Sequence, residues 1–167
     1  MLKILSRLKP APRGEIRDAG RIYPKTMQIS RKSVFYGENK CEDSTGGRME
    51  ILCLHLSCIM FALRDHGENG EKLTQAIYDV MVADFDVALR EEGLSDSGVV
   101  LRIKPLAGVF YARAKIYGYA LQDAENRTEK LSEVVNVHIL KSETTSTKNS
   151  AIFVAYIEEF VTLLEGL

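Results

Sequence analysis

Apolar residues recur at helical spacing along almost the whole chain. In residues 70–92, for example, Leu73, Ile77 and Val80 fall on one face, whereas Asp79 falls on another. No stretch of useful length alternates apolar and polar residues as a half-buried strand does. The pattern predicts an all-α protein, a single-domain irregular bundle of about six to seven helices.

Capping and turn residues mark where the predicted helices begin and end. Asn69 and Gly93 bound one of them, and Ser95 or Asp96 caps the next. Pro105 either kinks that helix or starts a new one. The predicted helices are 16–33 (interrupted by Pro24), 48–65, 70–92, 97–123, 127–141 and 150–165, with a polar, Gly-rich loop over 35–47.

The helix predicted over residues 48–65 is apolar nearly all round. Glu50, Ser57 and Arg64 form its only narrow polar strip, apart from Arg48 and His55. A helix of this kind is typically central and buried. We therefore expect His55 to point into the core.

Asp84 falls within the apolar stripe of its helix. A buried carboxylate without a partner is costly, so this side chain needs one. We expect a buried contact of Asp84 with Arg48 or with His55. Together with Glu50, these residues form the predicted core network.

Residues 1–14 carry four basic and no acidic side chains, with leucine and isoleucine interleaved. Either the segment is a frayed tail, or it is a basic amphipathic patch that touches anionic lipid. The predicted folded domain is 15–167. The apolar run 49–63 is short for a membrane span, and the N-terminus lacks the features of a secretory signal. We expect a cytoplasmic protein.

Charge is distributed unevenly along a chain whose net charge is −1. That net charge argues against DNA as a partner bound through bulk positive charge. Residues 65–92 hold eight acidic and two basic side chains, whereas residues 97–122 hold four basic and no acidic ones. Either two neighbouring helices pair through these charges, or a basic face meets a phosphate-rich partner such as lipid or ribosomal RNA.

Little in the sequence indicates catalysis or a cofactor. Cys53, His55 and Cys58 point to different sides of a helix and cannot converge on one metal ion, and no phosphate-binding or haem motif occurs. We expect a protein that is not an enzyme and holds no cofactor. The alternative is a small helical enzyme that uses Asp79 and Asp86 with His55 or His66.

The run 75–117, QAIYDVMVADFDVALREEGLSDSGVVLRIKPLAGVFYARAKIY, closely resembles the core of the ubiquinol–cytochrome c chaperone family. Upstream, SRKSVFYGENKCEDSTGGRMEILCLH resembles a second stretch of that family. The resemblance covers about Tyr23 to Leu121. The positions that carry it are Arg31, Phe35, Tyr36, Asp43, Gly47, Arg48, Glu50, Leu54, His55, Asp79, Asp84, Asp86, Leu89, Arg90, Glu91, Gly93, Asp96, Arg102, Lys104, Phe110 and Tyr111.

Three positions depart from the family pattern and affect local geometry. Ser44 replaces part of a tighter Pro-Asp-Thr turn, Pro105 interrupts the basic helix, and Ala112 stands where a glycine follows Phe-Tyr.

The resemblance implies a non-catalytic factor that assists the assembly of respiratory complex III. Mitochondrial relatives hold newly made cytochrome b near the ribosomal exit together with a small partner protein. For this chain it implies an assembly factor on the cytoplasmic or matrix face of a membrane, with peripheral contact to anionic lipid as an option. We expect client or partner binding through Phe35, Tyr36, Asp79, Asp86, Arg90, Arg102, Lys104, Phe110, Tyr111 and Arg113.

A stripe of soft side chains follows the predicted central helix, at Met49, Cys53, Leu56 and Met60. Methionine and cysteine suit an adaptable client surface, but at helical spacing they more often pack in a core. We favour the core for this stripe.

Overall fold

Helices make up nearly all of the chain that the computed structural model describes, residues 13–142 and 148–166. No strand occurs in these residues, and the predicted all-α fold is confirmed. The N-terminal segment 1–12 lies outside them. The helices are α1 (Arg13–Ser30), α2 (Thr45–Leu63), α3 (Gly67–Glu91), α4 (Asp96–Gln122), α5 (Arg127–Val135) and α6 (Lys148–Glu165), with short 3-10 helices η2 (Ser33–Phe35) and η3 (Arg64–His66) and a π-helical turn, η4 (Asn136–Leu140).

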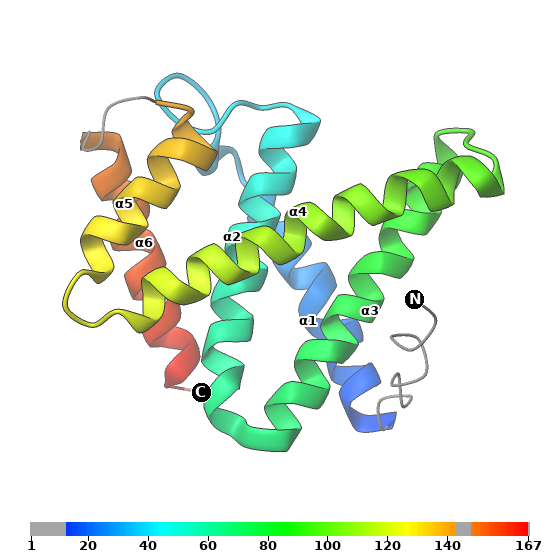
Figure 1. Ribbon diagram of the computed structural model, residues 1–167, viewed down its shortest axis with the longest axis horizontal. Coiled ribbons are helices and arrows are strands. Elements are labelled where there is room, and N and C mark those ends of the chain that lie inside the picture. Colours follow the sequence, from blue (N-terminus) through cyan, green and yellow to red (C-terminus); the bar gives the residue numbers. More distant parts are fainter. Residues whose placement is uncertain (1–12, 143–147, 167) are drawn as a thin grey trace.

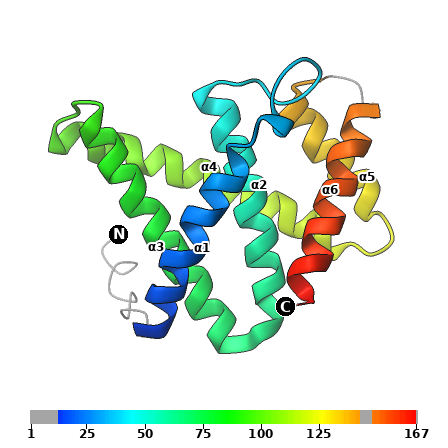
Figure 2. The same cartoon turned by 180° about the vertical axis from the view of Figure 1, so that it is seen from behind.

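Helix α2 is the centre of the structure (Figures 1 and 2). Helix α4 crosses it on one side, α1 lies on the other, and α5 and α6 flank the edge opposite α3. Two apolar clusters meet on α2: one is shared mainly with α4, α5 and α6, and the other with α1 and α3. The sequence prediction of a buried central helix is therefore confirmed.

Two prolines lie inside helices without ending them. Helix α1 continues through Pro24, and α4 continues through Pro105 as one helix of 27 residues. Both prolines are exposed, so water can bind the carbonyl group that each leaves without a helical donor. Helix α3 begins at Gly67, earlier than Asn69 suggested, and it ends at Glu91, with Gly93 just beyond it in the positive-φ conformation (φ +88°).

By length and hydropathy alone, the helical stretch Thr45–Glu91 includes a segment that could cross a membrane. Two thirds (67%) of that segment is buried inside the protein, as in the core helix of a folded domain. The stripe at Met49, Cys53, Leu56 and Met60 also belongs to the core. Cys53 and Leu56 are fully buried, and both methionines are half-buried against the apolar cluster shared with α1 and α3.

His55 points into the core, as expected. Its ring packs edge-on against Phe35 and Tyr156, with ring centroids 5.1 and 5.6 Å away. Nδ1 lies 2.7 Å from the Ile51 carbonyl oxygen, so it carries the proton and donates, while Nε2 accepts from the Tyr156 hydroxyl at 2.7 Å. Burial lowers the pKa of His55 to about 4, and the ring is neutral.

Glu50 forms an ion pair with Arg113 that joins α2 to α4. Two short contacts link them, from Nε and from one terminal nitrogen of Arg113 to the two carboxylate oxygens, both at 2.6 Å. Only 15% of the Glu50 side chain and 17% of that of Arg113 are exposed. The pair is planar and bidentate, a geometry that fixes how the two helices cross.

The predicted contact of Asp84 with Arg48 or His55 is wrong. Arg48 is exposed and binds Asp43 at 2.7 Å in the loop before α2. It lies in the first turn of α2, where that helix emerges from the core and a long charged side chain reaches water. His55 has its own buried partners, so of the four residues in the predicted network only His55 and Glu50 are in the core region.

We expect Glu50→Gln to lower the free energy of unfolding by about 2–3 kcal/mol, because it leaves the half-buried Arg113 without its counter-charge. Arg48→Gln is the matched control and should leave stability unchanged, since its ion pair is exposed. Urea unfolding measures both. Equal stability of the two variants would show that the Glu50–Arg113 pair contributes nothing.

Acid should weaken the fold through His55. As the pH falls from 6.5 towards 4, the unfolded chain takes up a proton that the folded protein excludes, so the free energy of unfolding decreases. The full loss approaches about 3 kcal/mol. His55→Gln should flatten this part of the pH profile, whereas His66→Gln, at an exposed position, should not. Identical profiles for wild type and His55→Gln would contradict a neutral buried ring.

Candidate client-binding surface

The end of α3 and the start of α4 form a helical hairpin that projects from the body of the protein (Figure 1). We call residues 86–102 the arm. Gly93 makes the turn possible because its positive φ suits glycine. The Ser95 hydroxyl then caps α4 by accepting from the Gly98 N–H, and Ser97 contacts the same hydroxyl at 3.2 Å.

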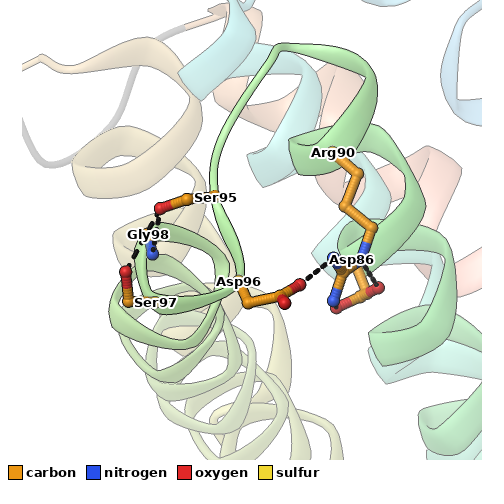
Figure 3. Close-up of polar contacts among 6 residues, drawn as sticks. All are labelled: Asp86, Arg90, Ser95, Asp96, Ser97 and Gly98. Atoms are coloured by element: carbon orange, nitrogen blue, oxygen red, sulfur yellow. Dashed lines mark hydrogen bonds and ion pairs between the residues drawn. The ribbon is translucent and has the colours of Figure 1, made fainter.

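One arginine ties the two sides of the arm together (Figure 3). Arg90 binds Asp86 one turn earlier in α3, at 2.6 Å, and also reaches Asp96 at the start of α4. Both carboxylates hold Arg90 in its charged form and raise its pKa. The contacts link the two helices close to the turn that joins them, near the tip of the projection.

The arm exposes large apolar side chains. Val87 is 53% exposed, Val100 63% and Leu101 75%. Leu89 and Val99 of the same segment are buried. Three exposed apolar groups of this size on one short segment are unusual on a surface that contacts only water.

An open groove of about 670 Å³ lies between α1 and α3 and reaches the arm at Val87. In Figure 2 these two helices run in the same direction and spread apart towards the arm. We call this the α1–α3 groove. Its lining is mainly apolar: Tyr23, Pro24, Met27 and Gln28 from α1, Arg31 just after that helix, and Val80, Ala83, Asp84 and Val87 from α3.

Asp84 has its polar partner inside this groove. The Tyr23 hydroxyl donates to Asp84 Oδ2 at 2.8 Å and so links the two walls. Tyr23 is buried, and both burial and the nearby carboxylate raise the pKa of its hydroxyl group. Asp84 itself is exposed along the groove, which explains why it needs no cation from the core.

The family model of the ubiquinol–cytochrome c chaperones matches residues 38–167. The chain belongs to this family. The crystal structure of the Cbp3 homolog from Brucella abortus is similar to it, with a TM-score of 0.74 and 28% sequence identity over 99% of this chain and 88% of that chain. No curated protein matches. The resemblance read from the sequence is confirmed, and the protein is an assembly chaperone for ubiquinol–cytochrome c reductase, complex III.

Two aromatic residues that we expected on the chaperone's surface are buried. Phe35 is 6% exposed because it packs against His55 and Tyr156, and Phe110 is 2% exposed because it packs beside Tyr78. The expectation that these two rings meet a client directly is wrong. Tyr111, next to Phe110, turns outward and is 60% exposed.

Tyr36 is half-buried and donates to the Ser30 carbonyl oxygen at 2.6 Å, which fastens the loop after α1. Arg113 is held by Glu50. Of the predicted binding residues, these two are therefore engaged inside the chaperone, and Asp86 and Arg90 hold the arm.

The acidic and basic stretches of the sequence do not form a row of ion pairs between α3 and α4. Arg102 and Lys104 are exposed and pair with no acid among the described residues. Asp79 on α3 is exposed too and accepts a hydrogen bond from Gln75 at 2.8 Å. Arg90 and Asp96 form the charge contact that links the two helices at the arm.

The residues considered for an enzyme do not share a site. His55 is enclosed by aromatic rings, His66 is exposed in η3, and Asp79 lies on the outer face of α3. Burial raises the pKa of Cys53 to about 12, which leaves its thiol protonated. No group of His, Cys, Asp or Glu within residues 13–142 and 148–166 is placed to hold a metal ion.

Sequence reasoning missed the α1 wall of the groove. The signal was present in the spacing of Tyr23 and Met27, one turn apart, with the polar Gln28 and Arg31 beyond them. Pro24 within that stretch led us to interrupt the helix there, so the continuous face was not recognised.

We expect Arg90→Ala to loosen the arm without unfolding the protein. Amide hydrogen exchange in residues 99–103 should accelerate several-fold, whereas exchange in α2 should not change. Lys72→Ala removes a comparable exposed pair with Glu68 at the other end of α3 and serves as the control. Unchanged exchange in the arm of the Arg90 variant would show that Arg90 does not hold it.

Proposed function

We propose that this chaperone holds newly made cytochrome b, with the α1–α3 groove and the arm receiving an apolar helix of the client. The apolar lining of the groove, which reaches the arm at exposed Val87, carries the proposal, and the arm also exposes Val100 and Leu101 of α4. An amphipathic or apolar helix that binds in such a groove exchanges its contacts with water for contacts with the apolar lining. Met27 offers a flexible side chain that adapts to different helices.

Polar groups at the groove suit a client that is later released. Arg31 and Gln28 line its α1 side, and Asp84 lies on its α3 side, so no part of the lining is sealed from water. A transmembrane helix of the client, which must stay soluble before it enters the bilayer, meets enough apolar surface to be held reversibly.

The proposal includes a location and a mode of action. The protein acts on the cytoplasmic face of the membrane, or on the matrix face in a mitochondrion, where the client is made. It makes and breaks no covalent bond, since holding a polypeptide needs only the surface described above.

A charged substitution on the exposed apolar rim tests this function. We expect Val87→Glu with Leu101→Glu to reduce recovery of cytochrome b with the chaperone about tenfold or more, because the client would bury unpaired carboxylates. Both side chains are exposed, so the fold should persist, as a thermal melt would show.

Val137→Glu, at a 60% exposed position on η4, is the control and should capture cytochrome b normally. Complex III should fail to accumulate in cells that carry only the double variant. Capture equal to that of the control, or recovery of other complex III polypeptides without cytochrome b, would contradict the proposal.

A further inference from the structure

The outer face of α4 carries basic and aromatic side chains at helical spacing. Lys104, Tyr111, Lys115 and Tyr119 follow one another at intervals of seven, four and four residues, which places them within one strip of the helix. All four are exposed, and the two tyrosines are 60% and 61% exposed. We call them the α4 strip. It is about 22 Å long, from the helical rise over the 15 steps between Lys104 and Tyr119.

No acid among the described residues forms an ion pair with the lysines of the strip. Residues 97–122 contain no acid, and Lys104 forms no ion pair with any described residue. Lys115 reaches the ring of its neighbour Tyr119, with 5.6 Å between the ammonium nitrogen and the ring centroid.

Two of the acids that flank α4 are already bound. Asp96 at its start binds Arg90, and Asp123 just beyond its end binds Lys130. These contacts lower the pKa of both carboxyl groups, and in each the cation offsets the charge of the carboxylate. The arrangement leaves a positive face on a protein whose net charge is −1.

We propose that the α4 strip is a contact surface for anionic phospholipid headgroups. Lysine side chains near such a surface are attracted to it, and tyrosine favours the boundary between headgroups and acyl chains. The strip runs along the exposed side of a helix of 27 residues, and such an elongated surface can lie along a plane. Neither the α1–α3 groove nor the smaller cavity between the Phe35 loop and α6 includes a residue of α4.

A tryptophan reporter tests the contact directly, because the chain contains no tryptophan. Tyr111→Trp places the reporter in the strip, and Val34→Trp places it at an equally exposed position, 60% in both cases, away from α4. With vesicles of phosphatidylcholine and about one third phosphatidylglycerol, we expect the emission of the Tyr111→Trp variant to shift to the blue and that of the Val34→Trp variant to stay unchanged. Equal shifts, or none, would overturn the proposal.

Charge variants complete the test in vesicle flotation. Lys104→Gln with Lys115→Gln should weaken binding to the anionic vesicles about tenfold or more. Arg21→Gln with Lys25→Gln changes the charge by the same amount on the exposed face of α1 and should leave binding within about twofold. Binding that both variants lose equally would overturn the proposal, as would strip-dependent binding to single-stranded RNA in the absence of binding to vesicles.

Discussion

The burial of α2 on all sides is the constraint on which the rest of the structure depends. A helix without a continuous polar face must be covered by other helices, and here α1, α3, α4 and α6 all pack against it. The few polar groups on α2 are satisfied in place: Glu50 by Arg113, and His55 by Ile51 and Tyr156. Because α3 and α4, with 25 and 27 residues, are longer than α2, with 19, their ends extend past it as the arm.

The architecture and the binding surface are two consequences of the same packing. Helices α1 and α3 both contact α2 but spread apart towards the arm, and that divergence leaves the α1–α3 groove open. The Tyr23–Asp84 hydrogen bond joins the two walls of the groove, α1 and α3. In the arm, the contacts of Arg90 stiffen the hairpin of α3 and α4. In Figures 1 and 2, α4 and α1 lie on opposite sides of α2. A chaperone that rests on headgroups through the α4 strip would thus present its groove away from the bilayer.

Much of the fold could be predicted from sequence, because helical periodicity and capping are local signals. Ser44, Gly93 and Ser95 mark helix ends where the structure has them, and the apolar character of α2 revealed the central helix. The partners of Glu50 and Asp84 could not be predicted, because Glu50–Arg113 and Tyr23–Asp84 join residues more than 60 positions apart in the sequence.

Exposure of single aromatic residues is equally non-local. Phe110 and Tyr111 are neighbours in sequence, yet one is buried and the other points to solvent, because successive residues of a helix differ by about 100° in direction. The family motif identified the segment that forms the arm, but it did not separate residues that hold the arm from residues that meet a partner.

Site-specific photo-crosslinking in cells tests the central claim most directly. A photoreactive amino acid at Val87, which is 53% exposed, lies where the groove meets the arm, and one at Val137, which is 60% exposed, lies on η4. The account predicts that the probe at Val87 captures cytochrome b while complex III is being assembled and that the probe at Val137 does not. Adducts from Val87 that contain no cytochrome b, or the same adducts from both positions, would contradict it.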